Sequence, residues 1–475
     1  MEDPLKSRFQ KSDVGSLSFS QEMLFLRGCA NGTNSFIARV ARVDGRFDLN
    51  AFKEALKAMV FYHEPLRTIW SYVDKIPTAM VCGSLDLEKH FTLIVRSATA
   101  ADLEAAGNLL VRDVLHTISP QDGISMAHGL LRLSETEWYW VFCFHHIAAD
   151  AWSIRLYGQT FTRAYSNGSL ILTDEPWTSS IGYAKRQRVW FKTSEAQESF
   201  DWWCNKIIQL QPRSVPLSLV NPKKLHQAPM RTMLSLGAIR FELQQCSTRL
   251  RCPLLAILIA ALARVLARRG EEGEEAVLSN FPGRTLTGAT NATGAFYNTL
   301  PLQFLVSRNA DVTDVIDDVT KVICEASERQ EVPMAVVNYA CVLDGTVDLT
   351  ELIPVRLNLT EHPLIAFVLP ECLVREVDAQ TFDVPCSPRA RTSLPTDDAD
   401  TVPTVSLSAT LLASDVSLTC DFDSAHYDQD DVDRFLDELA SDLDGIIQEV
   451  VGKIGDIPNA TSTIGDWRND IRNVS

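Results

Sequence analysis

The sequence lacks the short motifs of several common enzyme chemistries. It contains no P-loop, no GxGxxG and no GxSxG, so ATP, dinucleotide and serine-hydrolase chemistry have no support. Its 11 cysteines include no CxxC pair and no zinc-like spacing, which predicts reduced, mostly buried thiols and no metal site. Internal repeats of solenoid period are absent as well.

Positive charge is also scarce. Lys and Arg number 44 against 61 Asp and Glu, a formal net charge of −17, which opposes any broad hold on nucleic acid or an anionic membrane. The first residues, MEDPLKSRFQKSD, are polar and contain no apolar signal region. We therefore expect a cytoplasmic protein with neither a nucleic-acid nor a membrane partner.

The chain of 475 residues exceeds the length, roughly 250–300 residues, at which one hydrophobic core stops growing. Two lobes are expected, 1–172 and 173–452, followed by a tail or linker at 453–475. The boundary between the lobes is placed by the polar stretch Ser166 to Glu175. A second polar stretch, Asp378 to Thr404, predicts a long surface loop.

One stretch, Glu137 to Tyr157, organises the chain. Trp138 to Phe144 is aromatic and apolar without clean alternation, which predicts a strand covered on both faces. The strand delivers His145 and His146 to its end, and a helix begins near Asp150. A neutral imidazole there could act as a base or donate a hydrogen bond to developing negative charge. A packed, structural pair of histidines is the alternative.

Apolar spacing predicts the other elements. Helices are expected at Leu49 to Phe61, Ile181 to Trp203, Pro253 to Arg269, Val312 to Arg329 and Asp430 to Val450. Strand character is expected at Met126 to Leu133, Ala276 to Asn280, around Leu364 to Leu369, and over Val405 to Asp423. The helix that begins at Pro253 is very apolar but short for a membrane span, so we interpret it as a core helix.

Two arginines occupy unusual positions. Arg67 lies in the apolar run Leu66 to Trp70, where its burial would require a carboxylate partner. Arg284 follows the turn residue Gly283. An arginine in this position could bind a phosphate or, more often, a carboxylate.

The stretch His145 to Ser153, HHIAADAWS, resembles the HHxxxDGWS signature of nonribosomal peptide synthetase condensation domains. Five more segments are similar to motifs of that family and follow its order along the chain: LSFSQEMLFL, YHEPLRT, Tyr183 to Trp190, GAFYNTLPL and RQEVPM. The resemblance covers nearly the whole chain.

This resemblance implies an α/β fold of two chloramphenicol-acetyltransferase-like lobes in a V, with the active site in a tunnel between them. Carried over by position, His146 would be the catalytic residue, acting as a base or stabilising the tetrahedral intermediate, and His145 its structural neighbour. Asp150 would point away from the tunnel and pair with Arg67, holding the loop that carries His146.

The family resemblance also suggests supporting and tunnel-lining positions. Trp152 and Ser153 would pack and cap the helix after the loop. For Gly294, Asn298 and Thr299 two interpretations stay open: a segment that crosses over and closes the tunnel, or a turn glycine and a strand whose Asn satisfies local backbone.

Three residues depart from the family pattern. Ala151 replaces the usual glycine after the aspartate and would either narrow the tunnel or have no effect. Tyr297 is larger than the usual valine near the channel, and Arg329 replaces a histidine. None of the three removes the implied chemistry.

The resemblance implies acyl transfer between carrier proteins. Donor and acceptor would arrive as phosphopantetheine thioesters on peptidyl or acyl carrier proteins, with no cofactor held by this chain. Adenylation and carrier-serine motifs are absent, so such modules would act in trans or belong to a larger synthetase. Amide formation is the leading hypothesis. A free-standing acyltransferase that acts on a soluble amine or alcohol, and an inactive docking module, are the alternatives.

Overall fold

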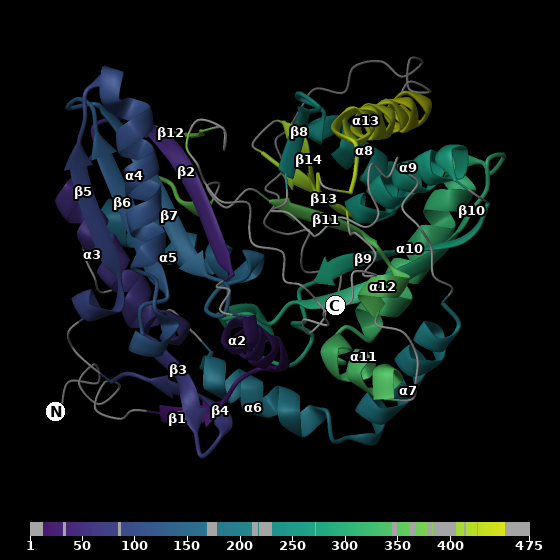
Figure 1. Cartoon of the computed structure of the whole chain (residues 1–475), viewed down its shortest axis with the longest axis horizontal. Helices are drawn as coiled ribbons and strands as arrows, with labels where there is room; N and C mark the ends of the chain where they lie inside the picture. Colours follow the sequence, from purple (N-terminus) through teal and green to yellow (C-terminus); the bar gives the residue numbers. More distant parts are fainter. Residues whose placement is uncertain are drawn as a thin grey trace.

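The computed structural model describes most of the chain. The described residues are 13–31, 35–83, 87–168, 178–210, 217, 230–270, 272–343, 349–361, 366–377, 382, 405–412, 415–424 and 426–451. The predicted lobe boundary at 172–173, most of the predicted loop at 378–404 and the predicted tail at 453–475 lie outside them. Two separate sheets with their own helices form two halves (Figure 1).

The first half is built on a five-stranded sheet. Its order is β12-β2-β7-β6-β5, with bounds Cys372–Glu376, Phe36–Gly45, Glu137–His145, Met126–Arg132 and Thr92–Ser97. The β5–β6 pair is parallel and the other neighbouring pairs are antiparallel. Strand β12 comes from the range 173–452, so residue number alone does not divide the two sheets.

Helices cover both faces of this sheet and explain the pattern of β7. Helices α3 (Leu49–Tyr62) and α5 (Ala151–Asn167) pack against each other on one face, and α4 (Leu103–His116) packs on the other. Alternate β7 residues, from Trp138 to Phe144, join the core on the α3 and α5 side, whereas Tyr139, Val141 and Cys143 join the core on the α4 side. The predicted strand buried on both faces is therefore confirmed.

A small three-stranded sheet and one helix lie at the base of the first half. Its order is β1-β4-β3, with bounds Asp13–Ser16, Ile76–Val81 and Thr68–Val73. Helix α2 (Phe19–Asn31) follows β1 and lies between the two large sheets (Figure 1). The N-terminal part of the chain therefore places a helix at the junction of the two halves.

The second half is built on a six-stranded sheet. Its order is β10-β9-β11-β13-β14-β8, with bounds Asn298–Val306, Gly273–Phe281, Val355–Glu361, Val405–Leu411, Val416–Phe422 and Met230–Ser235. Strand β11 pairs in parallel with both β9 and β13. Strands β13 and β14 alternate buried and half-buried residues, so one face of the sheet packs in the core and the other is only partly covered.

Most helices of the second half share one core with that sheet. They include α8 (Arg240–Leu250), α9 (Leu254–Arg269), α10 (Val312–Glu328) and α13 (Gln429–Val451). The others are α6 (Ser180–Trp190), α7 (Ser194–Ile208), α11 (Met334–Leu343) and α12 (Leu349–Leu352). Short 3-10 turns lie at Glu64–Arg67, Leu87–His90, Ala100–Asp102, Pro120–Asp122 and Ala289–Asn291.

The structure corrects two predicted elements. The single helix expected over Ile181 to Trp203 is two helices, because the chain leaves helical geometry around Thr193, whose side chain caps α7. The strand expected around Leu364 to Leu369 lies earlier, at β11, and residues 366–369 are not strand.

Within the described residues, no single helix has the length and apolar character to cross a membrane. The helices α8 and α9 together reach that length and composition, but they meet at 98°. Helix α9 itself is almost wholly buried in the core, as predicted.

Candidate active site

A tight loop between β7 and α5 carries the two histidines. The backbone N–H of His145 donates to the carbonyl of Ser125 at 2.9 Å, and that of His146 donates to the carbonyl of Ser35 at 2.8 Å. After His146 the loop turns, with the Ala148 and Ala149 N–H groups donating back to the carbonyls of the two histidines. His146 therefore has a fixed backbone position where the sheet ends.

Side chains from two helices brace this loop. The buried Tyr157 hydroxyl of α5 donates to the Ala148 carbonyl at 2.6 Å. Gln21 of α2 is also buried, and its Nε2 donates to the Ile147 carbonyl at 3.2 Å. The position of His146 thus depends on both α2 and α5.

His145 has a structural environment. It is buried, its Nδ1 accepts a hydrogen bond from the Ile147 N–H at 3.1 Å, and its ring meets Phe36 edge to face. Burial, together with the neighbouring His146, lowers the pKa of His145 to about 3. The ring is consequently neutral near pH 7 and protonated on Nε2.

His146 has a different environment. Burial lowers its pKa below 6.5, partly opposed by hydrogen bonding to the backbone of His146 itself, by the negative charge of Asp150 and by the backbone of Ala149, so its ring is neutral near pH 7. Its Nδ1 is enclosed by the protein. Nε2 is therefore the nitrogen available to a bound molecule.

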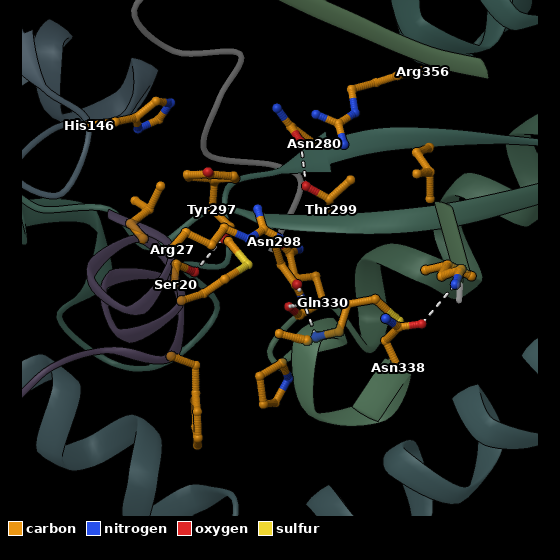
Figure 2. Close-up of a pocket in the computed structure, with 18 of the residues that line it drawn as sticks. Ser20, Arg27, His146, Asn280, Tyr297, Asn298, Thr299, Gln330, Asn338 and Arg356 are labelled. Carbon is orange, nitrogen blue, oxygen red and sulfur yellow. Dashed lines mark hydrogen bonds between the residues drawn. The ribbon is translucent and has the colours of Figure 1, made fainter. Parts of the chain in front are cut away.

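His146 opens onto a cavity of about 260 Å³ between the two halves. Figure 2 shows His146 at one side of this cavity, with Tyr297 between it and the hydrogen-bonded pair Asn280 and Thr299. The rings of His146 and Tyr297 have centroids 5.0 Å apart. The walls include α2, the ends of β9 and β10, parts of β11, β13 and β14, and α11 with the residues just before it.

Asp150 lies behind the loop in a closed network. Its Oδ1 accepts from the Ser153 N–H and hydroxyl, both at 2.8 Å, and from Arg284 at 2.9 Å. Its Oδ2 accepts from Arg284 at 2.7 Å and from the Phe296 N–H at 3.0 Å. Burial opposes ionisation, but the Arg284 guanidinium outweighs it and holds the pKa of Asp150 below its ordinary value.

The predicted pairing of Asp150 with Arg67 is therefore wrong, because Arg284 occupies that position. Arg67 is buried at the end of a 3-10 turn, where its charge acts on His63 and Cys82. The sequence left open whether Arg284 binds a phosphate or a carboxylate, and the structure shows the carboxylate of Asp150.

Gly283 directs Arg284 toward Asp150. It has a φ of +58°, and a Cβ there would lie 2.1 Å from the Phe296 carbonyl oxygen, so no side chain fits. The Tyr183 hydroxyl donates to the Gly283 carbonyl at 2.8 Å and fixes the turn. The arginine of the second half thus reaches the aspartate of the first.

The comparisons agree with this arrangement. The family model described as Condensation domain matches residues 11–462. The chain belongs to the condensation-domain family.

Curated relatives of this condensation domain are large synthetases. Tyrocidine synthase 3 of Brevibacillus parabrevis is 24% identical over 344 residues, which cover 72% of this chain and 5% of the relative. N-(5-amino-5-carboxypentanoyl)-L-cysteinyl-D-valine synthase of Penicillium rubens is 22% identical over 356 residues, covering 73% and 9%. The chain thus spans a small part of each relative.

Solved structures share the fold at low identity. The first condensation domain of the calcium-dependent antibiotic synthetase, in complex with a substrate analogue, has a TM-score of 0.72 at 16% identity and covers 95% of this chain and 100% of that one. The epimerization domain from the third module of tyrocidine synthetase B has a TM-score of 0.76 at 15% identity, covering 94% and 98%. The X-domain from teicoplanin biosynthesis has 0.70 at 18%, covering 92% and 95%. The predicted chloramphenicol-acetyltransferase-like α/β fold is consistent with these neighbours.

The residues after the aspartate support the loop of this condensation domain. The cap of α5 is Asp150 itself, and the Ser153 hydroxyl links Asp150 to Gly294, whose N–H donates to it at 2.9 Å. The Trp152 indole N–H donates to the Thr290 carbonyl of the second half at 3.0 Å. Ala151 is exposed and does not line the cavity, so its methyl group does not narrow this space.

The segment Gly294 to Thr299 combines the two interpretations that the sequence left open. Gly294 has a φ of +138°, and a Cβ there would lie 2.8 Å from Gln21 Nε2. Tyr297, Asn298 and Thr299 line the cavity. Asn298 also satisfies backbone, since its Nδ2 donates to the Gln330 carbonyl and its Oδ1 accepts from the Met334 N–H.

Several cavity residues were not anticipated from the sequence. They are scattered along the chain and follow no motif: Arg27, Ser35, Asn280, Arg356, Ser406 and Asp421. Only the fold, which brings all six to one cavity, identifies them.

Proposed function

We propose that this condensation domain forms an amide bond between a donor thioester and an acceptor amine, each on the phosphopantetheine arm of a carrier protein. The observation that carries the proposal is His146, a neutral imidazole whose accessible nitrogen faces a cavity formed by both halves. The family membership and the synthetase relatives support the substrate class. We also propose that the chain is divided into an N-terminal lobe at 1–172, a C-terminal lobe at 173–452 and a tail or linker at 453–475.

The proposed step uses His146 as the base. The acceptor amine attacks the donor thioester carbonyl, the C–N bond forms and the C–S bond breaks. His146 Nε2 takes the proton of the attacking amine and passes it to the departing thiolate sulfur. Asp150 and Arg284 take no proton, because each is held in its buried ion pair.

The test compares His146→Ala with the native chain. Donor-loaded carrier is incubated with and without acceptor-loaded carrier, and intact-mass analysis of both carriers detects the product. We expect product only with both carriers, and a loss of about 100-fold or more in His146→Ala at an unchanged circular dichroism spectrum. His116→Ala, an exposed histidine of α4, is the matched control and should retain full turnover.

Other outcomes would redirect the proposal. Product with a free amine alone would indicate a free-standing acyltransferase. Carrier binding without any product would indicate a docking module. Full turnover by a well-folded His146→Ala protein would remove His146 from the chemistry.

A further inference from the structure

A row of polar residues crosses the second sheet at the cavity. Strand pairing aligns Asn280 with Thr299, Arg356 with Ser406, and Asp421 with both Ser406 and Arg231. Arg356 lies opposite Leu278, two residues before Asn280 and on the same face of β9. We name these residues the polar row: Thr299, Asn280, Arg356, Ser406, Asp421 and Arg231.

The polar row belongs to the cavity rather than to the core. All of its members except Arg231 line the cavity. The next residues along the same strands, such as Leu357, Leu407 and Phe422, are buried in the hydrophobic core on the opposite face. Figure 2 shows Arg356 above Asn280, on the far side of Tyr297 from His146. The cavity thus has a reactive end and a polar end.

The charge of the polar row is positive in an acidic protein. Arg356 and Asp421 line the cavity, and Arg231, which does not, places a second positive charge against Asp421, so the row has a formal charge of +1 whereas the whole chain carries −17. Asp421 already accepts two hydrogen bonds from Arg231, at 2.7 and 2.9 Å. Arg356 has five N–H donors, so it can bind a substrate anion alongside protein partners.

The other charged residues of the cavity wall do not add net negative charge to that of the polar row. Arg27 of α2 lines the cavity, and so does the buried Glu331. Glu331 already accepts hydrogen bonds from the backbone N–H and the hydroxyl of Thr285. Tyr297 stands between the two ends, and burial raises the pKa of its phenol, which the charges of Arg27 and Arg356 partly oppose. Its hydroxyl is therefore protonated and able to donate.

We propose that the polar row binds a side-chain carboxylate of one of the two condensing acyl groups, with Arg356 as its direct ligand. This inference rests on the proposed function, which places the reacting thioester at His146. A substrate whose reacting end is at His146 would extend its side chain past Tyr297 toward the row. The substrate class is therefore an aminoacyl group with an acidic side chain, such as aspartyl or glutamyl.

The test uses glutamyl and glutaminyl groups, which have the same shape and differ in charge. Each is loaded in turn on the donor and the acceptor carrier, and competition in one mixture gives the ratio of products. We expect a preference for glutamyl of about 10- to 100-fold at one of the two positions, the range for a hydrogen bond to a charged group. Arg356→Met should remove that preference, and Arg356→Lys should keep part of it. Arg375→Met, an exposed arginine of β12, is the control and should keep the native ratio.

A binding measurement separates this inference from the chemistry. Nonreactive amide analogues of glutamyl- and glutaminyl-pantetheine are titrated into the native chain and into Arg356→Met. Tighter binding of the glutamyl analogue, lost in Arg356→Met, supports the polar row even where no condensation occurs. Equal binding of the two analogues, or the same ratio in Arg356→Met, overturns it.

Discussion

Adjacent residues of one motif have separate tasks in this site. His145 uses its Nδ1 to hold the loop backbone, whereas the enclosed Nδ1 of His146 leaves Nε2 to face the cavity. Asp150 makes its contacts behind the loop, where both of its oxygens are occupied. The aspartate therefore supports the loop and is not expected to exchange a proton with substrate.

Removing one partner of the Asp150–Arg284 pair should destabilise the fold. The side chains of both residues are at most 4% exposed, so Asp150→Asn or Arg284→Met leaves an uncompensated buried group. We expect the free energy of unfolding to fall by about 3–5 kcal/mol in urea denaturation. Arg375→Met breaks an exposed pair with Asp44 and should cost less than about 1 kcal/mol.

A double-mutant cycle tests which arginine is the partner. Asp150 and Arg284 should show a coupling energy of about 1–3 kcal/mol, and Asp150 and Arg67 less than about 0.5 kcal/mol. Stronger coupling to Arg67 would contradict the geometry described here.

Local sequence could identify the site only in part. The motif order indicated His146 and Asp150, because both lie within nine consecutive residues, His145 to Ser153. It led to Arg67 as the partner of Asp150 instead of Arg284, since both arginines suit a carboxylate and the choice depends on how the halves meet. The cavity residues Arg27 and Arg356 have no sequence signal, because they come from elements that meet only in the fold.

At the scale of elements, apolar periodicity predicted the long helices well. Helix α9 was expected from Pro253 to Arg269 and runs over Leu254–Arg269. Short elements were less well predicted. Strand β12 pairs with β2, more than 300 residues earlier, so no local pattern shows its sheet. Apolar spacing also did not show the break between α6 and α7, which depends on the single capping residue Thr193.

Buried histidines should make the first half sensitive to acid. Burial lowers the pKa of His63, His128 and His145 to about 3 from 6.5. Below pH 6.5 the unfolded chain binds these protons and the folded chain does not, so stability falls as the pH decreases. Each histidine contributes about 1.4 kcal/mol per pH unit, or about 4 kcal/mol per unit for all three.

Urea denaturation between pH 6.5 and about 5 measures this slope, above the pH at which aspartates of the unfolded chain, including Asp150, begin to bind protons. His128→Gln keeps an acceptor for the Trp140 indole N–H and should reduce the slope by about a third. A slope that is unchanged in this variant would mean that His128 is not a source of the acid sensitivity.

At the scale of the whole molecule, the site exists only where the two halves meet. Asp150, Trp152 and Ser153 of the first half bond to Arg284, Thr290 and Gly294 of the second. Ser18, directly before helix α2, and Ser20 within it donate to the carbonyls of Ala295 and Tyr297. The Asp150–Arg284 pair is the ionic member of this set and is buried, so the contacts that hold His146 also hold the halves together.

Arg284→Met should therefore uncouple the unfolding of the two halves. Hydrogen exchange along a urea series can follow β6 and β7 in the first half, and β13 and β14 in the second. In the native chain we expect both pairs of strands to lose protection at the same urea concentration, as one cooperative unit. In Arg284→Met the two midpoints should separate, because each half keeps its own core while a main contact between them is lost. Arg96→Met removes the Arg96–Asp113 pair within the first half and should shift both midpoints together. Coincident midpoints in Arg284→Met would show that apolar packing, rather than this ion pair, couples the halves.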